Sequence, residues 1–220
     1  MTTQERFQSW LKSDRPAPAE MMEGLHGDVK HLRLDKAGLE ARGWKDVPKD
    51  WSPEDGELWA GGYMEDRSIY DSDVFTGDGE PRTVHLGVDV FAPAGTPVFA
   101  PIEGFLHSAQ VNAGELDYGP TIILQHEMPG GLIFWTLYGH LSEESMFGLE
   151  EGDLITAGEV LGELGGAEIN GGWSPHVHFQ VMLDLKGKSG DFPGVCKKSE
   201  ADSWAAICPS PYEILGLKLT

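Results

Sequence analysis

The most regular pattern in the chain is a series of short apolar runs that begins near residue 83 and continues to residue 183. Within the runs, apolar residues alternate with others, as Phe179, Val181 and Leu183 do, and glycine and proline separate one run from the next. Alternation with a period of two is typical of half-buried strands. The runs predict strands at residues 84–91, 97–100, 104–109, 121–126, 132–138, 153–155, 160–164 and 176–183. Many short strands with this punctuation favour a mainly β fold of antiparallel sheets, arranged as a barrel or sandwich.

The residues before this series predict a helix and an irregular arm. Thr2 and Glu5 have the spacing of a capping box ahead of an apolar stripe at helical spacing. Residues 49–63 form a long loop, and we expect Trp51 and Trp59 to anchor it onto the sheet as a covering arm.

Three parts of the chain follow from this reading. Residues 1–79 are expected to be a helical and irregular arm packed on the core, and residues 80–185 the β domain. Residues 186–220 begin with a loop and continue as a tail with two short helical stretches, at 204–208 and 212–217.

The candidate chemistry lies in four histidines and one aspartate: His85, Asp89, His140, His176 and His178. Imidazole and carboxylate groups are ligands for Zn²⁺, and a catalytic zinc site takes three of them and leaves a position for water. His176 and His178 lie two apart on a predicted strand, so their side chains share a face. His85 and Asp89 lie four apart in a second predicted strand and also share a face. Two strands can therefore direct these groups to one point, with two imidazoles to spare.

These segments resemble the zinc-site motifs of the lysostaphin-type metallopeptidases, which cleave peptidoglycan cross-links. The likeness rests on His85-xxx-Asp89, Tyr138-Gly-His140-Leu and Pro175-His176-Val-His178-Phe, and it covers roughly residues 80 to 185. It implies that His85, Asp89 and His178 hold one Zn²⁺ per chain and that His140 and His176 are catalytic groups beside the bound water. Which of the two is the general base stays open.

The resemblance also implies an activity and a substrate. It indicates a zinc metalloendopeptidase that acts on a peptide or muropeptide. The turn before the His-x-His motif differs from the Thr-Gly-Ser-rich turn usual in that family, and its Asn170 and Trp173, with Tyr138, are candidate substrate-binding residues. Tyr138 is equally consistent with a core tyrosine. The segments 85–93 and 170–176 also resemble a variant module found inside fused phosphotransferase and aminotransferase proteins.

Other function classes fit the sequence less well. Cupins place their His-x-His motif first, whereas no histidine follows His178 here. Biotinyl and lipoyl carriers need a lysine at a hairpin tip, and none lies between Lys49 and Lys186. The remaining alternative is a non-enzymatic module on the same fold that binds a peptide or protein. The presence of all five metal-site and catalytic positions favours an enzyme.

The net charge of −20 excludes one class of partner and predicts a preference. Arg82 is the last basic residue before Lys186, so the candidate catalytic segment has no lysine or arginine. A nucleic-acid binder needs a basic footprint, which this segment lacks. We expect substrates with a free amine near the scissile bond to be preferred over acidic ones. The oligomeric state cannot be inferred.

Location and redox state follow from two further features. No apolar run has the length of a membrane span, and residues 1–7 lack the pattern of a signal peptide. This predicts a cytoplasmic protein, with an extracytoplasmic location by family analogy as the alternative. Cys196 and Cys208 lie twelve apart, and we expect reduced thiols, with a disulfide as the minority reading.

Overall fold

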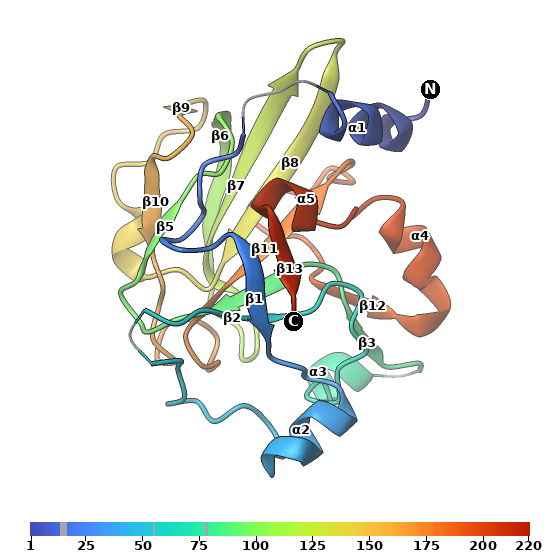
Figure 1. Cartoon of the computed structure of the whole chain (residues 1–220), viewed down its shortest axis with the longest axis vertical. Coiled ribbons are helices and arrows are strands. Elements are labelled where there is room, and N and C mark those ends of the chain that lie inside the picture. The colour runs from blue at the N-terminus through green and yellow to red at the C-terminus, as the bar shows by residue number, and fades with distance from the viewer. Residues whose placement is uncertain (14–16, 55, 78) are drawn as a thin grey trace.

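The computed structural model describes residues 1–13, 17–54, 56–77 and 79–220, and it consists mainly of strands (Figure 1). The strands are β1 (Gly27–His31), β2 (Trp59–Gly61), β3 (Arg82–His85), β4 (Val88–Phe91), β5 (Pro97–Phe99), β6 (Gly104–Asn112), β7 (Gly119–Met128), β8 (Leu132–Gly139), β9 (Leu154–Ile155), β10 (Val160–Glu163), β11 (His176–Met182), β12 (Val195–Lys197) and β13 (Leu217–Leu219). The helices are α1 (Thr3–Leu11), α2 (Lys36–Arg42), α3 (Asp73–Thr76), α4 (Ala201–Ala205) and α5 (Tyr212–Leu215), with 3-10 turns η1 (Glu143–Met146) and η2 (Lys198–Glu200). The predicted mainly β class is confirmed. Among the described residues, no helix is long and apolar enough to cross a membrane.

Nine strands form one mixed sheet in the order β13-β1-β2-β4-β11-β8-β7-β6-β9. The first two pairs are parallel, and the other pairs in this sheet are antiparallel. Strand β11 lies between β4 and β8, and all of its residues are buried. The side chains of its two histidines are therefore held by neighbouring strands on both sides.

The segment predicted as one strand over residues 84–91 is two strands in the structure. Strand β3 pairs with β12 in a separate small sheet, while β4 pairs with β2 and β11 in the large sheet. The chain turns at Leu86 and Gly87 because Leu86 is fully buried and Gly87 lies against β11. A Cβ at Gly87 would come within 2.6 Å of the Phe179 carbonyl oxygen, so this approach requires glycine. The prediction of a continuous strand was wrong, although both halves are extended.

The arm contacts the core through its aromatic residues, although Trp59, expected in a loop, lies in strand β2. The capping box is present: the Glu5 amide donates to Thr2 Oγ1 at 3.1 Å, and the Thr2 amide donates to Glu5 Oε2 at 2.8 Å. Trp51 packs on Phe91 of β4, with ring centroids 5.7 Å apart. The sequence did not reveal that β1 and β2 would extend the large sheet, because neither strand has a marked alternating pattern.

The tail contains a strand whose first residue, Leu217, was predicted to be helical. Helix α5 ends at Leu215 because Gly216 adopts the left-handed conformation, with φ of 63°. The following residues form β13, which pairs with β1. The prediction of a helix over 212–217 was therefore wrong in its last two residues. Cys196 and Cys208 are buried free thiols, as expected.

Candidate metal centre and active site

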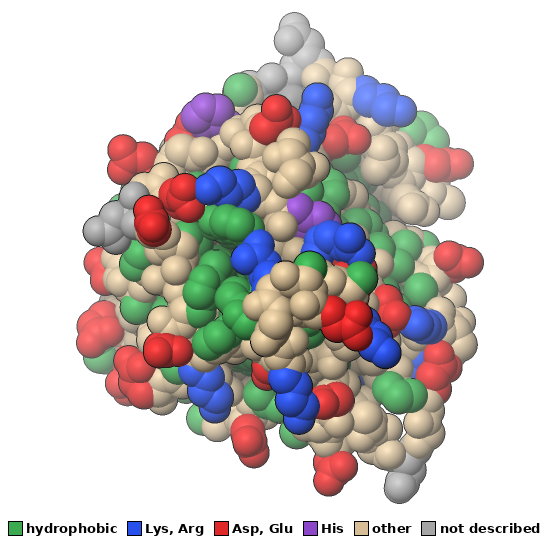
Figure 2. Space-filling view, turned by 60° about the horizontal axis from the view of Figure 1, so that its bottom comes forward, with side chains coloured by type: hydrophobic (Ala, Val, Ile, Leu, Met, Phe, Trp, Pro, Cys, Tyr) green, Lys and Arg blue, Asp and Glu red, His purple; other side chains and the backbone are tan. Residues whose placement is uncertain are grey.

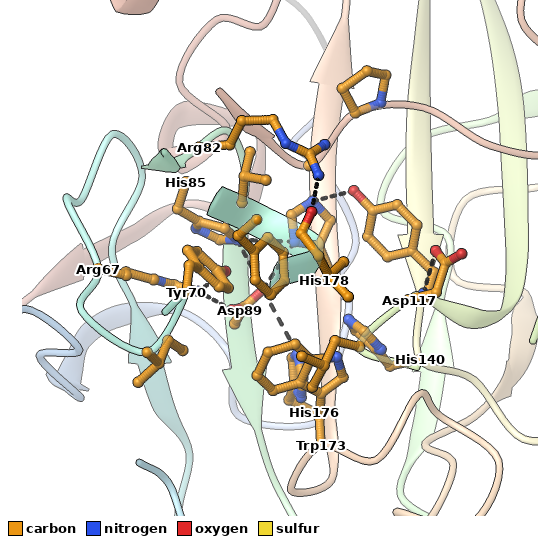
Figure 3. Close-up of a pocket in the computed structure, with 18 of the residues that line it drawn as sticks. Arg67, Tyr70, Arg82, His85, Asp89, Asp117, His140, Trp173, His176 and His178 are labelled. Carbon is orange, nitrogen blue, oxygen red and sulfur yellow. Dashed lines mark hydrogen bonds and ion pairs between the residues drawn. The ribbon is translucent and has the colours of Figure 1, made fainter. Parts of the chain in front are cut away.

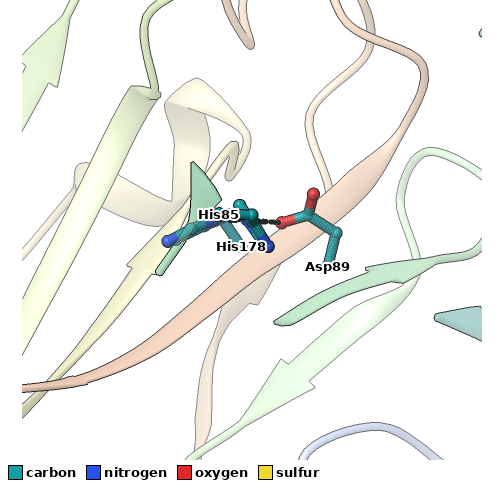
Figure 4. Close-up of side chains that lie close together, drawn as sticks. All are labelled: His85, Asp89 and His178. Atoms are coloured by element: carbon teal, nitrogen blue, oxygen red, sulfur yellow. Dashed lines mark hydrogen bonds and ion pairs between the residues drawn. The ribbon is translucent and has the colours of Figure 1, made fainter. Parts of the chain in front are cut away.

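Three of the predicted residues bring one ligand atom each to the same point (Figure 4). His85 ends β3, Asp89 lies in β4, and His178 lies in β11 directly opposite Asp89 in the strand register. His85 Nε2 lies 2.9 Å from His178 Nδ1 and 3.2 Å from Asp89 Oδ1. His178 Nδ1 lies 3.0 Å from Asp89 Oδ1. One nitrogen from each histidine and one carboxylate oxygen thus converge, and these three atoms could hold a metal ion.

The second ring nitrogen of each of these two histidines is hydrogen-bonded to a fixed partner. His85 Nδ1 lies 3.0 Å from the Gly62 carbonyl oxygen, to which it donates. His178 Nε2 lies 2.9 Å from Gln180 Oε1 and donates to it, because the Gln180 amide nitrogen donates to the Pro193 carbonyl oxygen at 3.1 Å. In each neutral ring the converging nitrogen therefore carries no proton, which is the state that binds a metal.

The carboxylate is ionised and held by an arginine. Arg67 Nη1 donates to Asp89 Oδ2 at 2.5 Å. Burial alone would raise the pKa of Asp89, but the neighbouring His85 and Arg67 outweigh it and hold this pKa well below its usual value. Burial, together with Arg67, lowers the pKa of His85 to about 4. Near pH 7 Asp89 is therefore a carboxylate and His85 an uncharged imidazole.

His140 and His176 lie beside this cluster, with ring centroids 4.2 Å apart. His140 follows the end of β8 and has a left-handed backbone with φ of 63°, an uncommon conformation for a residue with a side chain. Its Nδ1 donates to the Asn170 carbonyl oxygen at 2.9 Å. His176 Nδ1 donates to the Ser174 carbonyl oxygen at 2.7 Å, and its Nε2 lies 3.9 Å from Asp89 Oδ1. When either ring is neutral, its Nε2 therefore carries no proton and can accept one.

The protonation state of these two histidines suits that use. Burial lowers the pKa of His140 well below its ordinary value, and the nearby His176 lowers it further. Burial also lowers the pKa of His176. Both rings are therefore neutral near pH 7, so each can act as a base.

The five residues line a cavity of about 340 Å³ (Figure 3). One wall is aromatic: Trp173 packs edge-on against Tyr70 at 6.1 Å, and Phe75 packs on Tyr70 at 4.6 Å, between ring centroids. On another wall the Tyr118 hydroxyl lies 3.5 Å from His178 Nε2. Burial raises the pKa of Tyr118 well above its usual value, so its hydroxyl stays protonated and able to donate.

The three candidate substrate-binding residues occupy different places. Trp173 lines the cavity. Asn170 is fully buried, and it orients His140 through its carbonyl group. Tyr138 is fully buried in the core, packs on Phe179, and hydrogen bonds to Thr136 Oγ1 at 3.1 Å. The structure therefore places Tyr138 away from the cavity, and the tyrosine in the cavity is Tyr118.

The charge around the cavity differs from the sequence expectation. Arg67, Arg82 and Lys188 line it, and all three come from outside the segment that lacks basic residues. Four acidic residues, Asp89, Glu115, Asp117 and Asp191, also line it. The face in Figure 2 likewise shows basic side chains mixed with acidic and apolar ones. The cavity wall thus carries both signs of charge, and the preference for amine-bearing substrates stays a prediction.

The chain is similar to known peptidases over its central part. Residues 83–191 match the profile described as Peptidase family M23. The "DD-carboxypeptidase/endopeptidase Mpg" of Neisseria meningitidis serogroup B (strain ATCC BAA-335 / MC58) is 34% identical over 101 residues, which are 46% of this chain and 20% of that protein. An "Uncharacterized metalloprotease" of Haemophilus influenzae is 32% identical over 100 residues, which are 46% of this chain and 19% of that protein. The match thus spans about a fifth of the length of these curated relatives.

Among solved structures, the catalytic domain of the antimicrobial peptidase lysostaphin from Staphylococcus simulans aligns with a TM-score of 0.38 and 27% identity. That alignment covers 53% of this chain and 77% of the lysostaphin domain.

Proposed function

We propose that the chain is a zinc-dependent endopeptidase that hydrolyses an amide bond in a peptide, since residues 83–191 match the profile of Peptidase family M23. One observation carries the proposal: three unprotonated ligand atoms converge within 3.2 Å of one another, and two further neutral histidines adjoin them in one cavity.

The ligand atoms fit zinc. Tetrahedral zinc with bonds of about 2.0–2.1 Å to nitrogen and oxygen places its ligand atoms roughly 3.3 Å apart. The three donor atoms lie between 2.9 and 3.2 Å apart, so only small shifts are needed. His85, Asp89 and His178 would hold the ion. When bound, zinc would polarise the scissile carbonyl group and make a water molecule more acidic.

The two other histidines would move the protons. The free Nε2 of one neutral imidazole would accept the proton of the attacking water, and the imidazolium so formed would pass that proton to the leaving amine. The other histidine would donate to the developing oxyanion only after its own Nε2 takes up a proton. The carbonyl groups of Asn170 and Ser174 fix the orientation of these rings. The protonated hydroxyl of Tyr118 adds a hydrogen-bond donor to the cavity.

The proposed substrate is a peptidoglycan cross-link or a related muropeptide. Support comes from the match to Peptidase family M23 and from the similarity to the Neisseria meningitidis protein, which is named a DD-carboxypeptidase/endopeptidase. The aromatic wall of Tyr70, Phe75 and Trp173 supplies an apolar surface beside the histidines.

Turnover tests the proposal directly. The purified chain, with and without one equivalent of Zn²⁺, is incubated with a panel of muropeptides and short glycine-rich peptides, and products are identified by mass spectrometry. We expect zinc-dependent cleavage. A parent protein that retains zinc but cleaves none of these substrates would contradict the endopeptidase assignment and favour a binding module on the same fold.

Two variants separate the proposed roles. His178→Ala removes one of the three protein ligands and should lose zinc. His140→Ala should keep zinc while turnover falls by about 10²- to 10⁴-fold, the range for losing general acid-base help. His107→Ala is the control, because His107 is a half-buried residue of β6 that does not line the cavity. If His140→Ala loses zinc as readily as His178→Ala, the division of roles is wrong.

A further inference from the structure

The metal-ligand cluster depends on a segment that precedes the M23 match. Two of the three contacts that fix the ligand side chains come from residues 59–67, which we call the inner arm. The Gly62 carbonyl oxygen accepts from His85 Nδ1, and Arg67 donates to Asp89. The inner arm lies outside the matched residues 83–191.

Backbone hydrogen bonds hold the inner arm along β3. The Met64 amide donates to the His85 carbonyl oxygen at 2.8 Å, and the His85 amide donates to the Glu65 carbonyl oxygen at 3.0 Å. The Arg67 amide donates to the Thr83 carbonyl oxygen at 2.9 Å. The position of Arg67 relative to His85 is therefore set by main-chain pairing.

Arg67 is a buried cation between two carboxylates. Its side chain is 1% exposed. Its Nε donates to Glu65 Oε2 at 3.0 Å, and its Nη1 contacts both Asp89 Oδ2 at 2.5 Å and the Tyr70 hydroxyl at 3.1 Å. Although burial opposes the charge, Tyr70, Asp89 and Glu65 together hold the pKa of Arg67 above its ordinary value. The guanidinium group stays charged and is locked in place.

The strand opposite Asp89 leaves room for this guanidinium group. Gly61 of β2 pairs directly with Asp89 of β4. A Cβ at Gly61 would lie 2.5 Å from Arg67 Nη2, so glycine is the residue that lets the arginine reach the carboxylate. Figure 3 shows Arg67 and Tyr70 on one side of Asp89 and His140 on the other.

We propose that Arg67 is a positioning residue of the metal centre: it occupies Asp89 Oδ2 and so directs Oδ1 toward the two ligand histidines. A buried carboxylate oxygen without a partner is costly, so without Arg67 the side chain of Asp89 would turn toward another donor. With Arg67 on Oδ2, Oδ1 is left facing the two histidines and available for a ligand bond. The inference rests on the proposed zinc site and assigns the inner arm to it.

The test compares three variants of the full chain for metal affinity. Arg67→Met removes the cation. Gly61→Ala keeps the cation but places a methyl group where Nη2 lies. Arg67→Lys keeps the charge and loses the fixed fork of donors. The Zn²⁺ affinity is measured by competition with a chromophoric chelator, and the visible absorption of the Co²⁺-loaded proteins reports ligand geometry.

We expect Arg67→Met and Gly61→Ala to weaken Zn²⁺ binding by about 10- to 100-fold, the usual effect of losing a partner of a metal ligand. Both should alter the Co²⁺ spectrum, and Arg67→Lys should recover part of the affinity. Arg33→Met is the matched control, because Arg33 is also an arm arginine paired with a carboxylate, Asp35, but lies at the surface. Far-UV circular dichroism in chelator verifies that each variant is folded.

The outcomes distinguish this inference from the proposed function. If the parent binds no Zn²⁺, both are overturned. If the parent binds Zn²⁺ while folded Arg67→Met and Gly61→Ala match its affinity and Co²⁺ spectrum, only the role of Arg67 is overturned. If Arg67→Met does not fold, Gly61→Ala decides, because there the arginine is displaced but not removed.

Discussion

His126 should make the stability of the protein depend on pH, independently of the candidate site. It lies in β7, is fully buried and stacks on Phe134 with ring centroids 4.7 Å apart. Its Nδ1 donates to the Glu103 carbonyl oxygen at 2.8 Å, and its Nε2 lies 2.8 Å from Thr136 Oγ1. Burial lowers the pKa of His126 to about 4, from an ordinary value of 6.5.

The sign and the size of the effect follow from these two pKa values. Between about pH 6.5 and pH 4 the unfolded chain binds a proton at His126 that the folded chain does not. Stability is therefore highest above pH 6.5 and is lost as pH falls toward 4. A difference of about 2.5 pKa units corresponds to roughly 3 kcal/mol in all, of which roughly 2 kcal/mol is lost between pH 7 and pH 5.

Urea denaturation in the presence of a chelator measures this loss. The range from pH 5 to pH 7.5 avoids the isoelectric point, which is about 4.6. Replacing the buried imidazole in His126→Gln should remove about 2 kcal/mol of the difference between pH 7 and pH 5. The control His107→Gln, at a half-buried position of the neighbouring strand β6, should keep the slope of the parent. If His126→Gln and the parent lose stability equally on acidification, His126 does not titrate as its burial implies.

Two other predictions concern the metal centre. Gly87→Ala should weaken Zn²⁺ binding, because the added Cβ would lie 2.7 Å from His178 Nε2. The same overpacking should destabilise the fold by about 1–3 kcal/mol. Chelator competition measures the affinity and urea denaturation the stability, and an unchanged affinity would refute the first effect. At a free Zn²⁺ concentration about 1,000 times the Kd, removing the zinc should lower the free energy of unfolding by roughly 4 kcal/mol and lower Tm by about 8–16 °C for a domain of this size. Calorimetry that finds the same Tm with and without chelator would show that the folded chain does not bind zinc preferentially.

Local patterns in the sequence were sufficient to locate most strands and the residues of the candidate cluster. The alternating positions of β11 identify a buried strand, and the spacing of His176 and His178 places both on one face. The ligand group assembles because His178 is directly opposite Asp89 in the register. The alternation and the histidine spacing depend only on residues close together in the sequence, and the ligand group needs only one further strand pairing, so sequence patterns were enough to predict both.

The arrangement of the two tyrosines could not be predicted in this way. In a regular strand Tyr138 and His140 would face the same side, because they lie two residues apart. His140 instead has a left-handed backbone, which breaks the alternation at the end of β8. As a result His140 lines the cavity while Tyr138 packs in the core, and Tyr118 takes the place beside the histidines. The backbone conformation of one residue thus decides between the two interpretations of Tyr138.

The contacts of the inner arm could not be predicted from the sequence either. Arg67 lies in a stretch without periodic apolar residues, and its approach to Asp89 depends on the pairing of β2 with β4. The position of Gln180 beside His178 could have been predicted, because Gln180 lies two residues after His178 on the same face of β11. Its role depends on the Pro193 carbonyl group, which a separate loop supplies.

The parallel pairing of β1 with β13 has a consequence for the order in which the chain folds. Gly27 pairs with Leu217, whereas β6, β7 and β8 are joined by short connections and pair with their neighbours in the chain. Closing a long loop costs more conformational entropy than closing a hairpin, and contacts between distant residues slow folding. The hairpins that end near His140 should therefore form early, and the edge made by β1 and β13 should form late. Next to this edge lies β2, which contains Gly61, so the metal-binding geometry would be completed in one of the last steps of folding.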